Sequence, residues 1–200
     1  AGGTKGLNGT LPRRVTSRPL TRRRYAHFDD PLTDVALKTF TVQGDNIASH
    51  AFLPLIGYQK VVRKMDFSVF PPLAKNKERD IRYASHTDSA IYSIYAQALS
   101  EAYEQQIKLK GVGDCILAYR GGIGYNVPFA KSLIDEVRAR GCCHVTCLDV
   151  SGFFDNLDHK LLKAMLCRLL GTTRLPADWY KIYRRLTAFE YVLREDIEAR

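Results

Sequence analysis

Long hydrophobic runs are the first feature that this sequence lacks. No apolar stretch approaches the roughly 18 to 20 residues that a membrane-spanning helix needs, so we expect no association with a membrane. The first ten residues are polar and rich in glycine, without the apolar segment that marks a secretory signal. Cysteine is also scarce, because five cysteines in 200 residues are too few for a disulfide scaffold. We therefore expect a protein of the reduced cytoplasm.

Acidic side chains are missing from residues 1–25, which hold seven of the thirty basic residues. The other 23 basic and 21 acidic residues leave residues 26–200 with a net charge of +2, out of +9 for the chain. The basicity therefore belongs mainly to an N-terminal arm. Arms of this kind commonly bind nucleic acid by neutralising phosphates and releasing counterions. The alternative interpretation is a solvated, disordered tail.

The rest of the composition is that of a soluble globular chain, with 46% hydrophobic and 26% charged residues, enough for one ordinary domain or two small ones. Asp30-Pro31 predicts a helix start, with an N-cap acid before proline. Ser85 and Asp88 fit a capping box, and apolar residues follow them at helical spacing up to Gly111. Three more helices are predicted at residues 126–140, at 159–170 with Gly171 as its C-cap, and after Pro176. The first of these three is expected to bury an apolar stripe: Phe129, Ala130, Leu133, Ile134 and Val137.

Strands are predicted in two places. Residues 67–84 indicate a hairpin whose strands are 67–70 and 81–83, with a polar, basic tip between them. Residues 143–149 form an apolar run that favours a buried strand.

The segment 147–159, Cys-Leu-Asp-Val-Ser-Gly-Phe-Phe-Asp-Asn-Leu-Asp-His, carries the clearest chemical signal. Asp149 stands at the carboxyl end of the predicted buried strand, shortly before a glycine. A carboxylate in that position is costly unless a counter-charge or a metal compensates it. The alternative is that Asp149 caps the following turn.

This segment resembles motif A of reverse transcriptases, in which an aspartate ends a strand and an aromatic residue follows five positions later. The form Asp-x-x-Gly-Phe-Phe-Asp-Asn-x-Asp-His is especially similar to that of prokaryotic retroelement enzymes. Residues 52–56 resemble the early fingers segment, and the basic hairpin resembles the fingertip hairpin. Residues 118–122 resemble the Tyr/Phe-Arg-Pro-Gly segment of the family, with Gly121 in place of proline. Together these similarities cover residues 50–195.

The resemblance implies an α+β fold, the fingers and partial palm of a right-hand polymerase, with helices packed on small antiparallel sheets. It divides the chain into a basic arm (1–25), fingers (26–141) and the first part of the palm (142–200). It implies an RNA-directed DNA polymerase that adds dNTPs to a primer 3′-hydroxyl by two-metal nucleotidyl transfer. The implied partners are Mg²⁺, dNTPs, an RNA template and a DNA or RNA primer. The resemblance is also compatible with a non-coding RNA or protein partner.

Site residues also follow from the resemblance. Asp149 would bridge two Mg²⁺ ions, with the Val150 carbonyl as a further ligand. Phe154 corresponds to a steric gate that excludes a 2′-hydroxyl; ordinary core packing is its alternative role. In the fingertip, Arg79 with Lys75 or Lys77 matches a triphosphate-binding pair, with a solubilising charged turn as the alternative.

The remaining polar residues near these motifs receive less specific roles. Arg120 is expected to contact template or incoming nucleotide. Asp155, Asp158 and His159 are interpreted as structural, ordering the start of the helix that follows. Cysteines and a histidine at 142–147 suggest zinc, but their spacing matches none of the usual zinc motifs, so we do not expect a zinc site.

A second motif of the family, Tyr-x-Asp-Asp after motif A, is absent from these 200 residues. The pair Asp29-Asp30 precedes motif A and does not fit it. We therefore predict that residues 1–200 alone do not polymerise, and that the missing carboxylates lie elsewhere. The alternative function is a non-catalytic nucleic-acid-binding module derived from a polymerase. Residues 79–86 resemble defence-associated and abortive-infection relatives, which favours a role in antiphage defence, and some of these relatives work without a template.

Overall fold

The computed structural model describes residues 18–118, 120 and 124–199. These residues form two compact units. The hairpin unit consists of residues 18–97 together with 174–199, and the helical unit consists of residues 98–173. The boundary between them falls within one long helix, α3 (His86–Lys110).

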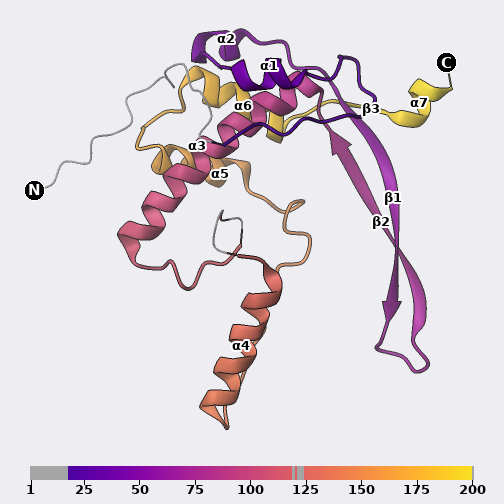
Figure 1. The fold of residues 1–200 in the computed structure, drawn as a ribbon, viewed down its shortest axis with the longest axis vertical. Coiled ribbons are helices and arrows are strands. Elements are labelled where there is room, and N and C mark those ends of the chain that lie inside the picture. Colours follow the sequence, from indigo (N-terminus) through magenta and orange to yellow (C-terminus); the bar gives the residue numbers. More distant parts are fainter. Residues whose placement is uncertain (1–17, 119, 121–123, 200) are drawn as a thin grey trace, which may run out of the picture. The chain divides into compact units, whose positions relative to one another are not determined.

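The described residues are mixed in class, with helices and one small sheet (Figure 1). The other helices are α1 (Asp34–Thr39), α2 (Gly44–Ser49), α4 (Asn126–Arg140), α5 (His159–Leu169), α6 (Ala177–Thr187) and α7 (Arg194–Glu198). The strands are β1 (Leu55–Asp66), β2 (Leu73–Tyr83) and β3 (Tyr191–Leu193). None of the helices within the described ranges combines the length and the apolar character that crossing a membrane requires.

The sheet has the order β2-β1-β3 and lies in the hairpin unit. β1 and β2 are antiparallel, with Ile56 opposite Tyr83 at one end and Asp66 opposite Leu73 at the other. β3 pairs with β1 in parallel, and Leu55 faces Tyr191. The sheet is therefore antiparallel in the hairpin, as expected, but it gains a short parallel edge.

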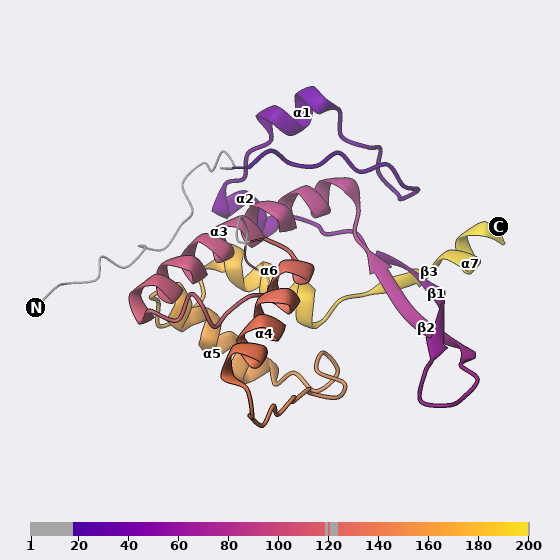
Figure 2. The same cartoon turned by 60° about the horizontal axis from the view of Figure 1, so that its bottom comes forward.

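The hairpin is much longer than predicted, and its predicted first strand is wrong. Residues 67–70 belong to the turn, while the strands are residues 55–66 and 73–83. The strand bounds could not be predicted because most side chains of the outer hairpin are exposed on both faces. Apolar and polar residues therefore do not alternate along these strands. Figures 1 and 2 both show the hairpin extending away from α1, α2 and α6 of its own unit.

A glycine shapes the base of the sheet. A Cβ added at Gly57 would lie 2.9 Å from Cδ of Arg82, the residue opposite on β2. The bare backbone of Gly57 lets the Arg82 side chain cross β1, and its guanidinium lies 4.2 Å above the Tyr191 ring on β3. A cation–π contact thereby joins the two outer strands of the sheet.

The core of the hairpin unit gathers around the first half of α3. Ile91, Ile94 and Tyr95 of that helix are buried, as predicted from their helical spacing. α2 packs against α6, whose Trp179 stacks edge to face on Tyr95 at 4.9 Å. The Tyr95 hydroxyl donates a 2.7 Å hydrogen bond to Oδ2 of Asp178, a fully buried carboxylate. Burial and this hydrogen bond both raise the pKa of Tyr95.

The start of α3 shows one half of the predicted capping box and corrects a second prediction. Ser85 caps the helix, but the Asp88 carboxylate contacts His50 and the Leu53 N–H instead of the Ser85 N–H. Ser85 Oγ accepts a hydrogen bond from the Asp88 N–H at 3.1 Å. Asp29, expected to belong to a local helix start, instead accepts hydrogen bonds from the N–H groups of His86 and Thr87, both at 2.9 Å. The helix expected at Asp30-Pro31 begins only at Asp34, because the Thr33 side chain caps it.

In the helical unit the predicted helix ends are largely correct. Asp158 caps α5 by accepting hydrogen bonds from the N–H groups of Lys160 and Leu161, and Gly171 follows with φ of 66°. Gly141 ends α4 with φ of 71°. The N-cap of α4 is Tyr125, without a side-chain hydrogen bond, rather than Asn126.

Two predicted buried features of the helical unit are wrong. The apolar stripe of α4 is exposed at Ala130, Leu133 and Ile134 and only half-buried at Phe129 and Val137. Residues 143–149 are exposed and have no regular secondary structure. An apolar helix stripe and an apolar strand are buried only when another element packs against them. None of the strands in the described ranges pairs with residues 143–149.

Candidate nucleic-acid interface

The hairpin register sorts the charged side chains onto two faces. Residues directly opposite in an antiparallel pair point to the same face, and alternate residues on a strand share it. One face therefore collects the cross-strand pairs Lys60–Arg79, Val62–Lys77, Lys64–Lys75 and Asp66–Leu73. The other collects the pairs Gln59–Asp80, Val61–Glu78, Arg63–Asn76 and Met65–Ala74.

The first of these surfaces, called here the basic face, carries five cations: Lys60, Lys64, Lys75, Lys77 and Arg79. All five are exposed, and none forms an ion pair with a carboxylate of the described residues. Like charges lie directly opposite each other in two of its pairs, which destabilises a free hairpin. A bound polyanion would remove that repulsion.

The opposite face has a mixed character. It carries the acids Glu78 and Asp80, with Arg63 as the cation of its outer part. Asp80 lies 3.8 Å from the Arg82 guanidinium. The hairpin thus has an excess of positive charge on one face and nearly balanced charges on the other, an arrangement suited to a linear anion bound on the basic face.

The described end of the N-terminal arm lies on the same unit. The Arg18 N–H donates to Oε1 of Gln97 at 3.2 Å, and Arg22 pairs with Asp34 at 3.3 Å. Tyr25 stacks on His86 at 4.6 Å and donates a hydrogen bond to the Ala84 carbonyl. Residues 18–25 are therefore fixed to the fold, and residues 1–17 lie outside the described residues.

The motif A residues lie in an exposed loop of the helical unit. Oδ1 of Asp149 accepts a hydrogen bond from the Val150 N–H at 2.9 Å. The Phe154 side chain is 74% exposed, and its ring packs edge to face on Phe153 at 5.3 Å. Among the described residues the Phe154 ring is therefore not part of a packed core, and its role stays a prediction.

Mg²⁺ prefers oxygen ligands, and the Asp149 carboxylate with the Val150 carbonyl has the right chemistry for one such ion. A pair of ions needs further carboxylates. Within the described ranges no group of three or more His, Cys, Asp or Glu side chains gathers to hold a metal. These residues therefore do not by themselves fit the two-metal centre that the resemblance implies.

Arg120 is tied into the helical unit. Its guanidinium donates to both carboxylate oxygens of Glu104, at 2.7 and 2.9 Å, and to the carbonyls of Gly113 and Ile116. The hydrogen bond to Glu104 raises the pKa of Arg120. Four of the five N–H donors of a guanidinium are thus engaged, so a contact with nucleotide requires breaking part of this set. Its neighbours at 119 and 121–123 in the predicted motif lie outside the described residues.

The predicted site residues divide between the two units. Lys75, Lys77 and Arg79 lie together on the basic face of the hairpin unit, while Asp149 and Phe154 belong to the helical unit. The sequence prediction missed Lys60 and Lys64. The period-two spacing of the cations could have indicated a shared face, but only once the strand bounds were known.

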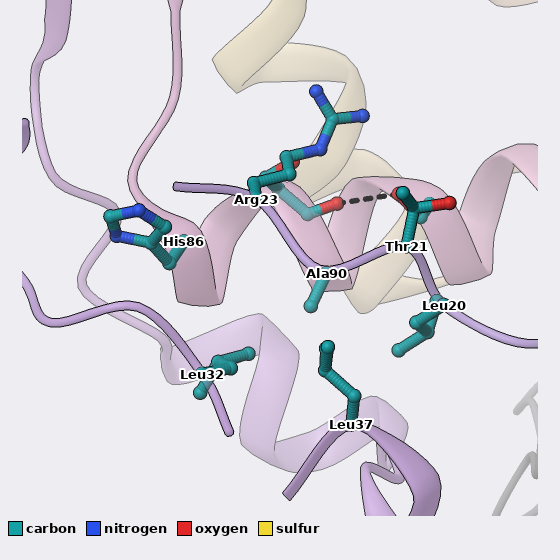
Figure 3. Close-up of a pocket in the computed structure, with 9 residues that line it drawn as sticks. Leu20, Thr21, Arg23, Leu32, Leu37, His86 and Ala90 are labelled. Carbon is teal, nitrogen blue, oxygen red and sulfur yellow. Dashed lines mark hydrogen bonds between the residues drawn. The ribbon is translucent and has the colours of Figure 1, made fainter. Parts of the chain in front are cut away.

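The described part of the hairpin unit also has a small cavity between the arm, α1 and α3 (Figure 3). Leu20, Leu32 and Leu37 point toward Ala90 of α3, while the Arg23 guanidinium points away from them (Figure 3). The cavity volume is about 10 Å³, which holds about one water molecule. A nucleotide does not fit in this cavity.

Comparison with known proteins gives no relative from which to transfer a function. No protein-family model matches this chain, and no curated protein matches it either.

Proposed function

We propose that this chain forms the fingers and the first part of the palm of a reverse transcriptase. The observation that carries the proposal is the placement of Lys75, Lys77 and Arg79 on one exposed face of a projecting hairpin, free of carboxylate partners among the described residues. These are the residues that the motif resemblance assigns to the incoming triphosphate. The register supports that role by directing all three cations to the same side.

In this proposal the fingertip cations hold phosphate oxygens. The planar guanidinium of Arg79 contacts two oxygens at once, and a lysine adds a point charge. Phe154, exposed on its loop, is available to lie against the sugar of a dNTP and to exclude a 2′-hydroxyl. The template is RNA and the primer is DNA or RNA, with antiphage defence as the proposed setting.

The metal-dependent step needs groups beyond those described. When bound, a Mg²⁺ pair would activate the primer hydroxyl and stabilise the leaving pyrophosphate. Asp149 supplies one carboxylate, and the others must come from outside the described residues. We therefore expect no primer extension by residues 1–200 alone.

A second candidate function is a non-catalytic module that binds nucleic acid. The observation that favours it is the lack of a carboxylate cluster around Asp149 within the described ranges. The basic face serves this function equally well, because phosphates of any polynucleotide would be held by the same cations.

Nucleotide binding tests the fingertip assignment. Titration of the chain with a fluorescent dNTP should show about tenfold weaker binding for Arg79→Ala, because a charge-assisted hydrogen bond to phosphate is lost. Arg63→Ala is the matched control, since it removes an exposed arginine from the opposite face of the same hairpin. Equal losses in the two variants would contradict a specific phosphate site.

Primer extension separates the two candidate functions. The complete reading frame should extend a primer on an RNA template, and Asp149→Ala should abolish extension while leaving RNA affinity within about twofold. RNA binding without any extension would favour the non-catalytic module. Extension by residues 1–200 alone would contradict the expected incompleteness of the site.

A further inference from the structure

The turn of the β1–β2 hairpin exposes apolar side chains at an unusual density. Five large apolar residues in the segment 65–73 face solvent: Met65, Phe67, Val69, Phe70 and Leu73. Two are aromatic, with Phe67 79% exposed and Phe70 98% exposed. Isolated exposed apolar residues are ordinary, but such a group at the end of a projecting hairpin indicates a binding surface. We call residues 65–73 the apolar tip.

The apolar tip continues directly into the basic face. Lys64 and Lys75 face each other just below the tip, and Lys77 and Arg79 follow along β2. Alternate residues on a strand lie about 7 Å apart, so Lys75, Lys77 and Arg79 cover about 14 Å along one line. A single triphosphate covers only part of that length. With Lys60 and Lys64 on the same face, the track therefore also has room for the phosphates of a polynucleotide.

We infer that the hairpin binds a single strand of nucleic acid, with the phosphates along the basic face and unpaired bases stacked on Phe67 and Phe70 of the apolar tip. Positively charged grooves combined with exposed aromatic rings are the usual means of holding single strands. Every base has a π-face, so this mode of binding tolerates any sequence. The surface needs no metal and no carboxylate.

An anionic membrane is the other surface that attracts apolar tips with basic flanks. The charge distribution favours the nucleic acid. A membrane would favour cations confined to the depth of the tip, whereas here the cations continue away from the tip through Lys77 and Arg79. The opposite face, with Arg63, Glu78 and Asp80, has no such excess of positive charge. The cations follow a line along the strand, as a polynucleotide backbone does.

This inference extends the proposed function by giving the hairpin a polynucleotide partner, and it does not require nucleotidyl transfer. The two can fail separately. Loss of dNTP binding in Arg79→Ala concerns the proposed function, whereas stacking on the apolar tip is measured with an oligonucleotide and no dNTP.

The test is binding of a single-stranded DNA of about eight nucleotides that contains 2-aminopurine, whose fluorescence falls when it stacks. The unchanged chain should bind and quench the probe. Phe70→Ala should weaken binding about tenfold and restore fluorescence, and Phe70→Leu should do nearly the same because it keeps apolar area but removes the ring. Tyr125→Ala is the control for an exposed aromatic residue outside the hairpin and should bind normally.

The salt dependence separates stacking from phosphate contacts. Lys77→Ala should lower the slope of log K against log salt by about 0.7, the contribution of one phosphate contact on a single strand. Phe70→Ala should leave the slope unchanged while lowering affinity. Circular dichroism of each variant verifies the fold, which the almost fully exposed Phe70 side chain does not support.

Two results would overturn the inference. One is unchanged affinity and unchanged quenching in the double variant Phe67→Ala, Phe70→Ala. The other is binding to phosphatidylserine vesicles that depends on both phenylalanines, while the oligonucleotide does not bind; the apolar tip would then be a membrane-contacting element.

Discussion

The start of α3 and the loop at residues 142–154 contain similar kinds of residues and reach opposite outcomes. At the start of α3, Asp88 is almost fully buried and engaged: Oδ1 lies 2.7 Å from His50 Nε2, and Oδ2 accepts the Leu53 N–H at 2.9 Å. In the loop, Asp149 is exposed, and its carboxylate accepts a hydrogen bond from the N–H of its neighbour Val150. Apolar side chains differ likewise, since Ile91 is buried while Leu148 is 93% exposed.

The difference shows which contacts hold each region in place. The start of α3 is held by residues outside the helix, which include Asp29, His50 and Leu53, so its polar groups find partners within this unit. The loop has an apolar sequence but no strand beside it among those described. Its residues are therefore free to contact a ligand or another part of the protein, as the proposed role of Asp149 and Phe154 requires.

The largest expected effect comes from deleting the buried carboxylate. Asp88→Ala should lower the free energy of unfolding by about 3 kcal/mol, because His50 and the Leu53 N–H lose a buried acceptor. Asp149→Ala removes an exposed carboxylate and should change the free energy of unfolding by less than about 0.5 kcal/mol. Urea unfolding of both variants measures the difference. Equal losses of unfolding free energy would show that the two carboxylates do not differ in structural importance.

A smaller effect is expected at the hydrogen bond between α3 and α6. Tyr95→Phe removes the hydroxyl that donates to Oδ2 of Asp178, whose Oδ1 is buried without a partner among the described groups. We expect a loss of about 1.5 kcal/mol in urea unfolding. The double variant Tyr95→Phe, Asp178→Asn serves as control, since its loss should be less than the sum of the two single losses. Additive losses would show that the two side chains do not interact.

The acid side of the pH profile should depend on Asp29. Burial alone would raise the pKa of Asp29, but hydrogen bonds from the Thr87 and His86 N–H groups and from the His86 ring outweigh it and lower the pKa to about 2. The unfolded pKa is about 3.9, so this stabilisation is present above about pH 4 and is lost as the pH falls toward 2. Asp29→Asn should flatten that part of the profile, measured as the urea midpoint against pH. An unchanged profile would assign acid sensitivity to other carboxylates.

The smallest effect on stability should accompany a change in function. Phe154→Ala should alter the free energy of unfolding by less than about 0.5 kcal/mol, because the ring is exposed and touches mainly Phe153. In the complete enzyme the same change should increase incorporation of rNTPs, measured by competition with dNTPs during primer extension. A stable variant with unchanged discrimination would leave Phe154 without the proposed role.

Local signals in the sequence predicted the helix ends well. The cap at Ser85, the N-cap Asp158 and the glycine stops at 111, 141 and 171 are all found in the structure. Each depends on hydrogen bonds or backbone angles within a few residues. The hairpin could be predicted only in outline, because its exposed outer strands have no periodic burial, and so the shared basic face remained hidden.

The sequence by itself determined the motif A resemblance, the excess of positive charge and the positions of the longer helices α3 to α6, since these are properties of neighbouring residues. Only the tertiary structure decided that Asp29 caps α3 across 57 residues, and that five cations share one face of the hairpin. It also decided that the apolar run at 143–149 is not a strand. The physical reason is that local caps and helical spacing involve neighbouring residues, whereas strand register, burial and the Asp29 cap depend on partners far away in the chain.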